Sequence, residues 1–432
     1  MMRVAWFALA LAWVWSEACG VAGHSAPGGR FSPQPLCAGE TRAPWCDAVP
    51  DETWRRLIVV GDVHGDYGRM ARVLREAGLV EVDPKSGQIG WVTALAPGTP
   101  QTDVVFAGDY VDWRGEPLEM GPTGQAIGNE GAVLVLRALR GLMQSASGGA
   151  GSGVGSKGLF GLGGARVSAN PMPAGVTLTA LAGNHDLMML DAAELVVGDG
   201  EVGLDIITAE ELARLTGPST PKAEWAKVVK SLGATGQLRM RKFYNWWTQG
   251  GLQTTSGFGG MKAWAEEMKY AEGSLGEWMR GTLLLGVRVG DTHVSHTLAD
   301  NARLWAPVET WASGASGAPA YCAARNDYTW GRGLWTSSAS GSNASGSTSF
   351  AEADVALALR NLNATRIIVG HTQKSKRQRP SAYWDGRIIN VDQHGIPGSP
   401  PFVDLVAPPA DRPPAQHLVT HGALLHKACA IE

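Results

Sequence analysis

Short apolar segments alternate along the chain with longer segments in which apolar residues recur every three or four positions. The short segments are rich in Val, Ile and Leu, and most end at Gly, which indicates buried strands. The longer segments have the period of an amphipathic helix. Strands that alternate with helices predict an α/β fold. The expected strands are 57–61, 104–108, 176–183, 283–289, 366–370 and 387–391.

Helices are expected between these strands, at 69–77, 132–143, 210–232 (with a break at 218–221), 261–279 and 351–362. Two segments dominated by Gly and Ser, near 144–165 and 337–349, interrupt the pattern. They cannot bury enough apolar surface to order themselves, which predicts flexible insertions in loops. Polar motifs lie on both sides of each insertion. We therefore expect one catalytic domain over 55–406, between an N-terminal extension (24–54) and a Pro-rich C-terminal tail (407–432).

The N-terminus has the pattern of a signal peptide over residues 1–23. Arg3 precedes an apolar run from Ala5 to Trp15, and small residues follow up to Gly23. The run is shorter than the roughly 20 apolar residues that a membrane span needs. A short anchor or a buried helix is the alternative. The prediction is entry into the secretory pathway, to the outside of the cell or an organelle lumen, with no stable membrane span after cleavage.

Glycosylation sequons and cysteines agree with secretory entry. The sequons begin at Asn343 and Asn363. Four cysteines would remain after cleavage, which allows three pairings in an oxidising compartment. Cys37 with Cys46 is the preferred pair because the loop between them is short, and four free thiols are the alternative. The other two are Cys322 and Cys429.

The composition and net charge of the chain bear on which kind of partner it binds. The chain has 432 residues, a net charge of -3 and 44% hydrophobic residues, as expected of a globular protein. It has no excess of basic residues, so nucleic acid is not an expected partner.

Polar clusters follow the first three expected strands. They are Gly61-Asp-Val-His-Gly65, Gly108-Asp-Tyr-Val-Asp-Trp-Arg-Gly115 and Gly183-Asn-His-Asp186. Later segments add His296 and Gly370-His371-Thr372. Open α/β sheets place their sites at the carboxyl ends of strands, so these clusters are candidates for one site.

Carboxylate, imidazole and amide ligands together suit Mn, Fe or Zn. Two such ions about 3.5–4 Å apart can clamp the attacking and leaving oxygens of an in-line displacement, and they lower the pKa of a bound water. A histidine that binds no metal can protonate the leaving oxygen. Arginine suits phosphate because its planar guanidinium donates two parallel hydrogen bonds.

The order of these motifs resembles the calcineurin-like metallophosphoesterases, and within them the phosphoprotein phosphatase lineage. The branch with the greatest resemblance is the Shewanella-like protein phosphatases. Trp330-Gly-Arg-Gly333 adds to the likeness, which spans about 55–404. It implies two packed mixed β-sheets flanked by helices in four layers, and two divalent metal ions, Mn first or Fe/Zn.

The resemblance also implies residue roles. Asp62, His64 and Asp109 would hold the first metal, with Asp109 bridging. Asn184, His296 and His371 would complete the second. His185 would be the general acid, with Asp112 as its orienting partner. Arg114 and Arg332 would bind phosphate, with help from Asn184.

Four features depart from the family pattern. Trp113 is inserted before Arg114, and Asp186 stands where Glu is usual. His296-Thr-Leu replaces the expected His-Gly-Gly, and His293 is a rival ligand. On a strand these two histidines would point to opposite faces, so only one can serve.

Three functions remain open from the sequence. The first is a phosphatase acting on phospho-Ser/Thr or phospho-Tyr in proteins. The second is a small-molecule or dinucleotide phosphohydrolase with the same metal chemistry. The third is a non-catalytic phosphate-binding relative, for which Trp113 and the altered segment after His296 are the motivation.

Overall fold

A computed structural model describes the following parts of the chain. These are 55–112, 119–120, 126–127, 129–145, 170–197, 215, 222–299, 325–332, 352–372, 381–392, 402–407 and 416–418, with single gaps at 85, 233, 270, 326 and 385. The expected signal peptide, the N-terminal extension, the four cysteines, Asn343 and Arg114 lie outside the described residues. So do the second Gly/Ser-rich insertion and most of the first.

A four-stranded sheet carries the first three polar clusters. Its order is β13 (Phe402–Ala407), β1 (Arg55–Val60), β4 (Gln101–Phe106) and β7 (Val176–Ala180). β1, β4 and β7 are parallel, and β13 is antiparallel to β1. Val60 lies opposite Phe106, and Phe106 lies opposite Ala180. Because the three parallel strands end level, the residues that follow them come together at one edge.

A six-stranded sheet carries the later histidines. Its order is β11 (Ser381–Tyr383), β12 (Ile388–Asn390), β10 (Arg366–Val369), β9 (Thr292–Ser295), β8 (Gly286–Val289) and β14 (Gln416–Leu418). β9, β10 and β12 are parallel, whereas β8 and β9 form an antiparallel hairpin. β14 belongs to the segment expected to be a tail, and it pairs with β8 at the edge of the sheet. Two small ribbons complete the strands, β2 (Val80–Val82) with β3 (Ile89–Trp91), and β5 (Glu119–Met120) with β6 (Ala126–Ile127).

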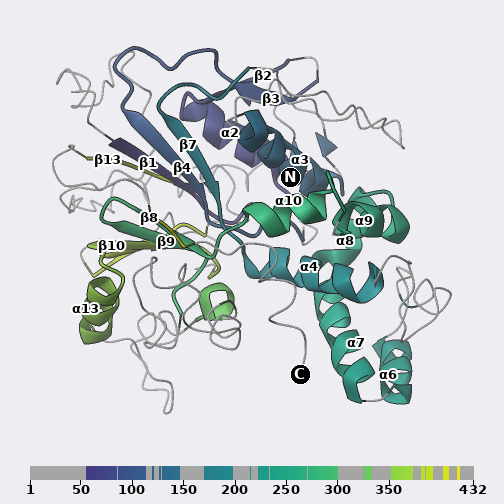
Figure 1. Ribbon diagram of the computed structural model, residues 1–432. Coiled ribbons are helices and arrows are strands. Elements are labelled where there is room, and N and C mark those ends of the chain that lie inside the picture. Colours follow the sequence, from purple (N-terminus) through teal and green to yellow (C-terminus); the bar gives the residue numbers. More distant parts are fainter. Residues whose placement is uncertain are drawn as a thin grey trace, which may run out of the picture.

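The two sheets pack face to face (Figure 1). Alternate residues of β1 point to opposite sides: Leu57 and Val59 contact the second sheet, whereas Ile58 and Val60 contact the helices. Both faces of the strand are buried, which explains its unbroken apolar run. The second sheet contributes Val287, Val289, Val294, Ile368, Ile389 and Val391 to the layer between the sheets. The expected architecture of two packed mixed sheets flanked by helices is confirmed.

Helices cover the outer faces of both sheets. α2 (Tyr67–Glu76) and α3 (Gly131–Gln144) pack on the four-stranded sheet, and α13 (Glu352–Asn361) packs on the six-stranded one. All three lie within two residues of the expected bounds. α2 begins where Asp66 accepts a hydrogen bond from the backbone N–H of Arg69 at 2.6 Å, a side-chain N-cap.

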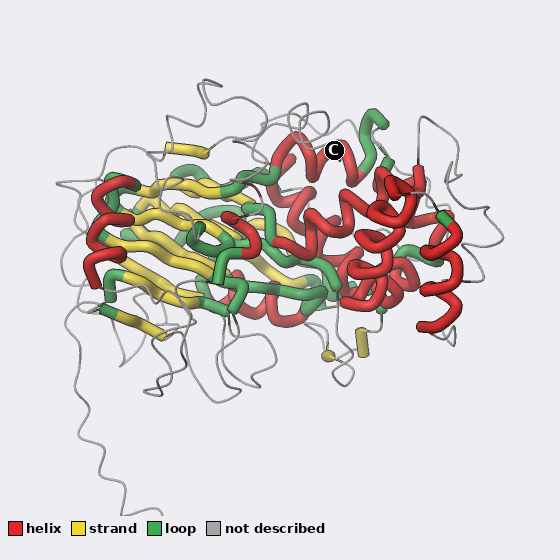
Figure 2. Tube along the Cα trace, turned by 90° about the horizontal axis from the view of Figure 1, so that it is seen from below, coloured by secondary structure: helices red, strands yellow, loops and turns green. Residues whose placement is uncertain are grey.

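A group of helices extends beyond the sheets at one end of the molecule (Figure 2). The group comprises α4 (Asn184–Val197), α6 (Lys222–Ser231), α7 (Ala234–Trp246), the π-helical turn η3 (Trp247–Gly251), α8 (Leu252–Gly257), α9 (Met261–Met268) and α10 (Leu275–Thr282). We call these elements the helical layer. In the described part of the expected helix 210–232, α6 begins at Lys222.

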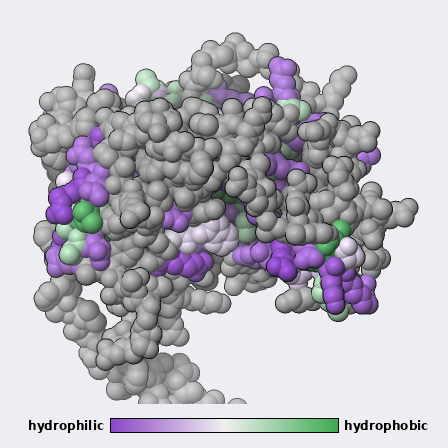
Figure 3. All heavy atoms as spheres, turned by 60° about the horizontal axis from the view of Figure 1, so that its bottom comes forward, coloured by the Kyte–Doolittle hydropathy of each residue, from purple (hydrophilic) through white to green (hydrophobic). Residues whose placement is uncertain are grey.

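The helix expected over 261–279 is wrong as a single element. It is divided into α9 and α10 because Lys269 is extended, Gly273 has a φ of 78° and the Ser274 hydroxyl caps α10 through the Glu277 N–H. Within the described residues, no helix is both long and apolar enough to cross a membrane. Hydrophilic side chains make up most of the described surface on the face that Figure 3 shows.

Candidate active site

Two adjacent turns bring the first cluster of side chains together. The backbone N–H groups of Val63 and His64 donate to the Asp109 carbonyl at 3.1 and 2.7 Å, and Gly65 N–H donates to the Tyr110 carbonyl at 2.9 Å. His64 and Asp109 have φ angles of 46° and 54°, a region that non-glycine residues seldom adopt. Such strained backbone occurs most often at functional sites, where the surrounding structure maintains it.

Glycines allow two buried carboxylates to approach the neighbouring backbone. A Cβ at Gly183 would lie 2.1 Å from Asp109 Oδ1, and a Cβ at Gly370 would lie 2.1 Å from Asp62 Oδ1. Any larger residue at either position would displace a carboxylate. The glycines of the third and last motifs are therefore required by close approach.

Asp62, His64 and Asp109 form one side of the site. His64 Nδ1 lies 3.0 Å from the Val111 carbonyl, which can only accept, so Nδ1 carries the proton. The lone pair on Nε2 then faces Asp109, whose Oδ2 is 3.6 Å away. The backbone N–H of His371 lies 3.0 Å from Asp62 Oδ2 and ties this carboxylate to the second sheet.

Asn184, His296 and His371 form the other side. His296 Nδ1 lies 2.8 Å from the Ala107 carbonyl, which leaves a lone pair on Nε2. That Nε2 lies 3.0 Å from Asn184 Oδ1, 3.2 Å from His371 Nδ1 and 3.5 Å from Asp109 Oδ2. His371 Nδ1 is also 2.8 Å from Asn184 Oδ1.

Electron-pair donors therefore meet around Asp109 with few protons between them, an arrangement that suits a cation. Burial alone would raise the pKa of Asp109, but its attraction to His296, His185, His64 and His371, in their protonated forms, would lower it. Burial lowers the pKa of His296, and lowers that of His371 to about 3, so both imidazoles are neutral near pH 7. Neutral imidazoles beside an ionised carboxylate are the forms that bind divalent metals.

Asp62 supports the same interpretation. Its pKa is raised by burial, and further by the negative charges of Asp392 and Asp109. A bound cation would stabilise the ionised form of Asp62 against burial and against these two negative charges. Asp109 belongs to two groups of potential ligands, one with His64 and His185 and one with His296 and His371, and the ligand atoms of each group lie within 4.8 Å of one another.

His185 has a different partner from the other histidines. Its Nδ1 lies 2.8 Å from Asp112 Oδ2, and both side chains are buried. Its backbone N–H donates to Asp109 Oδ1 at 2.9 Å. Burial raises the pKa of Asp112, while its hydrogen bonds to His185 and Thr254 oppose the rise. Asp112 therefore orients the His185 ring through Nδ1.

Thr297 accounts for the unusual sequence after His296. Its hydroxyl donates to the Gly331 carbonyl at 2.6 Å, and its N–H donates to the Tyr328 carbonyl at 3.1 Å. The threonine thus ties the turn of His296 to the segment that carries Arg332. A glycine could make only the backbone bond.

Arg332 and Trp330 lie on the outer side of the histidines. Arg332 is exposed, and its charge contributes to lowering the pKa of His296 and His371. The Trp330 ring is 6.0 Å from that of His371, and its side chain is 39% exposed. Trp330 and Arg332 are therefore exposed residues near the histidine cluster.

His293 is not part of the cluster. It is fully buried in β9, its ring lies 6.2 Å from that of Tyr328, and neither ring nitrogen has a hydrogen-bond partner among the described residues. Of the two rival histidines, the structure brings His296 to Asn184 and His371. Arg114 lies outside the described residues.

Two acidic residues at the site had no role in the sequence-based prediction. The Asp186 carboxylate accepts hydrogen bonds from the N–H groups of Asp109, Tyr110 and Gly183 at 2.8 to 2.9 Å. Asp392 is buried and contributes to the raised pKa of Asp62. It follows the last predicted strand directly, a position that could have identified it.

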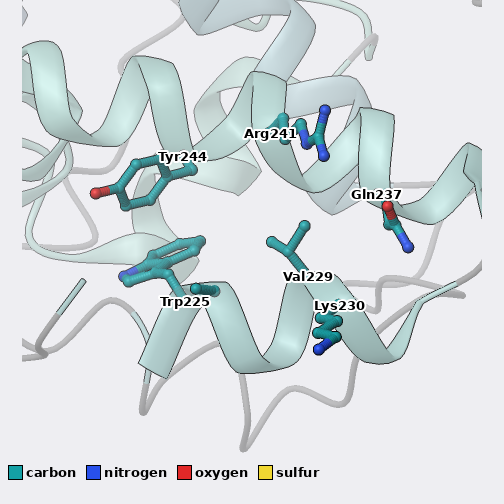
Figure 4. A pocket seen from close by; sticks show the side chains of 7 residues that line it. Trp225, Val229, Lys230, Gln237, Arg241 and Tyr244 are labelled. Atoms are coloured by element: carbon teal, nitrogen blue, oxygen red, sulfur yellow. The ribbon is translucent and has the colours of Figure 1, made fainter. Parts of the chain in front are cut away.

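A separate cavity of about 320 Å³ lies between α6 and α7 (Figure 4). Trp225, Val229, Gln237 and Tyr244 are among its lining residues, and Lys230 and Arg241 stand at the same opening. None of the residues around Asp109 lines this cavity.

No known protein-family model matches the chain, and no curated protein matches it. Solved structures do match. A cold-active protein-tyrosine phosphatase of a psychrophilic Shewanella species is 17% identical with a TM-score of 0.36, over 81% of this chain and 75% of that one. Another structure of a cold-active protein tyrosine phosphatase is 16% identical with a TM-score of 0.37, over 84% and 80%. A protein serine/threonine phosphatase from Saccharomyces cerevisiae is 10% identical with a TM-score of 0.29, over 80% and 72%. The similarity to each of these three structures is low.

Proposed function

We propose that this protein is a dinuclear metal-dependent phosphatase that hydrolyses phosphate monoesters on phosphoproteins. The observation that carries the proposal is the meeting of two sets of metal-binding atoms on one carboxylate, that of Asp109. Asp109 Oδ2 lies 3.6 Å from His64 Nε2 on one side and 3.5 Å from His296 Nε2 on the other. A carboxylate between two such groups suits a bridge between two ions.

The proposed ligands divide into two sets. Asp62, His64 and Asp109 would hold one ion. Asp109, Asn184, His296 and His371 would hold the other, with Mn the first expectation and Fe or Zn the alternatives. When bound, such ions supply Lewis-acid activation of the phosphate and of the attacking water.

The protein's own residues would complete the chemistry. His185 would carry a proton on Nε2 and donate it to the leaving oxygen, while Asp112 would hold the ring through Nδ1. Arg332, with Arg114 and Asn184, would bind the phosphate oxygens. The exposure of Arg332 and Trp330 beside His371 favours a protein substrate, because a phosphorylated side chain can enter while the rest of that substrate stays outside.

One experiment separates this proposal from its alternatives. Purified protein is analysed for bound metal and assayed on phosphoserine, phosphothreonine and phosphotyrosine peptides and on a dinucleotide polyphosphate. The proposal expects two metals per chain and preferred turnover of peptides. Preference for the dinucleotide would identify a small-molecule phosphohydrolase, and metal loss with no turnover would identify a binding protein.

We also propose that the chain enters the secretory pathway. In support, the sequon residue Asn363 is exposed in a turn after α13, with a φ of 50°. Expression in eukaryotic cells should yield protein that lacks residues 1–23 and loses mass on treatment with a glycosidase. The Asn363→Gln variant should lose part of that mass change. Uncleaved, unglycosylated protein inside the cell would contradict the proposal.

A further inference from the structure

Two side chains of the helical layer contact the carboxylate of Asp112. Trp246, the last residue of α7, donates its ring N–H to Asp112 Oδ1 at 3.1 Å. Thr254, in α8, donates its hydroxyl to the same oxygen at 2.9 Å. The donors lie 134 and 142 residues beyond Asp112 in the sequence, and all three side chains are 0 to 1% exposed.

These contacts leave the Asp112 carboxylate little freedom to rotate. Oδ1 accepts from Trp246 and Thr254, while Oδ2 binds His185 Nδ1 at 2.8 Å. Thr254 also accepts a hydrogen bond from the Asp112 backbone N–H at 3.1 Å. One hydroxyl thus contacts both the main chain and the side chain of Asp112.

The π-helical turn η3 connects the two donors and packs directly on Asp112. Gly250, in this turn, has a φ of 126°, and a Cβ there would lie 2.6 Å from Asp112 Cβ and 2.7 Å from its Cα. Only glycine permits this approach. The chain is kinked at this point, because the backbone angles of Gly250 are not helical.

Packing holds the indole of Trp246 in place. It stacks on the ring of Trp264, with centroids 4.7 Å apart and planes inclined by 22°. On another side Gly251 approaches so closely that a Cβ there would lie 2.7 Å from Trp246 Cδ2. The ring therefore reaches Asp112 from a position fixed by its neighbours.

We infer that Trp246 and Thr254 are positioning residues that hold the Asp112 carboxylate in the orientation that aligns His185. They contact neither His185 nor the proposed metal ligands in the described hydrogen bonds, so they would act only through Asp112. The inference rests on the proposed function, in which His185 protonates the leaving group. Its competitor is a structural role, in which the same bonds only attach the helical layer to the sheets.

The test uses variants that remove one hydrogen bond each. Trp246→Phe removes the indole N–H, and Thr254→Val removes the hydroxyl with little change in shape. Each should lower kcat about tenfold or more on a phosphoserine peptide, a fraction of the roughly 10²–10⁴-fold that a general acid contributes. Each should change kcat on p-nitrophenyl phosphate less than about threefold, because that leaving group needs little protonation. Thr254→Ser keeps the hydroxyl, so its kcat on the phosphoserine peptide should be close to that of the wild type.

Matched controls lie beside both residues. Trp264→Phe removes an indole N–H from the same stack, and that N–H has no hydrogen-bond partner among the described residues. Thr255→Val removes a buried hydroxyl that donates to the Leu252 carbonyl in its own helix. These variants perturb the same packing without touching Asp112, so they should affect both substrates equally or not at all.

A second measurement does not depend on activity. In protein labelled with ¹⁵N-histidine, the Nδ1–H proton of His185 should give a downfield NMR resonance, assigned by its absence in His185→Asn. Trp246→Phe and Thr254→Val should shift or broaden it, whereas the two controls should leave it unchanged. An unchanged resonance in the first pair, or equal losses on both substrates, would overturn the inference. An inactive wild type with an intact resonance would overturn the proposed function instead.

Discussion

The Asp186 carboxylate accepts a hydrogen bond from the backbone N–H of Asp109 at 2.8 Å. The last residue of the third motif therefore fixes the backbone conformation of the second motif. The same carboxylate accepts two further N–H groups, those of Tyr110 and Gly183. It therefore joins the turns after β4 and β7, from which Asp109 and Asn184 project. The strained φ of 54° at Asp109 is maintained in part by these bonds.

Asp186→Asn should lower both stability and metal occupancy. An amide has one acceptor oxygen where the carboxylate has two, so at least one buried N–H loses its acceptor, at a cost of about 1–3 kcal/mol. Urea unfolding and metal analysis measure the two effects. Glu81→Gln, at an exposed position of β2, is the control and should change neither. An Asp186→Asn protein as stable as the wild type would show that the bonds are dispensable.

Asp109→Asn should remove most of the activity and leave the fold intact. The neutral amide is a poor bridge, so binding of both proposed ions should weaken. We expect a loss of at least about 100-fold in kcat, the scale of removing one pre-organised charged group from a site. Circular dichroism and metal analysis accompany the assay. Turnover near the wild-type value with two metals bound would contradict a bridging role.

His185→Asn should lower the rate far more with a phosphoserine peptide than with an aryl phosphate. An alkoxide leaving group requires a proton, whereas an aryl oxide leaves readily as an anion, and general acid catalysis contributes about 10²–10⁴-fold. Metal occupancy should remain at two per chain. Equal losses on both substrates, or loss of an ion, would show that His185 is a ligand or a structural residue.

His293 should make stability depend on pH. Burial first, and the positive charge of Arg288 second, lower its pKa to about 4 from an ordinary value of 6.5. Between pH 4 and pH 6.5, His293 is therefore protonated in the unfolded chain but neutral in the folded protein. The free energy of unfolding should therefore fall as pH drops from 6.5 towards 4, by up to about 3 kcal/mol at about 1.4 kcal/mol per pH unit.

Urea unfolding of the metal-free protein at pH 7.5 and pH 5 measures how the free energy of unfolding changes with pH. His293→Leu should reduce the loss of stability between the two values, because leucine takes up no proton in either state. The difference between variant and wild type isolates His293 from the other histidines. An identical loss in both proteins would show that His293 does not contribute.

The sequence by itself determined the alternation of strands and helices and the candidate residues around Asp109. Val60, Phe106 and Ala180 end short apolar strands, and a glycine and a candidate metal ligand follow each of them within four positions. These signals are local, because a buried strand and the turn after it are encoded by neighbouring residues.

Only the tertiary structure decided how that site is supported. The choice of His296 over His293 followed from the position of β9 between β8 and β10. The contacts of Trp246 and Thr254 with Asp112 bridge more than 130 residues, and no periodic pattern near either residue indicates its partner. Hydrophobic periodicity specifies which face of an element is buried, whereas packing of distant elements decides which buried polar groups meet.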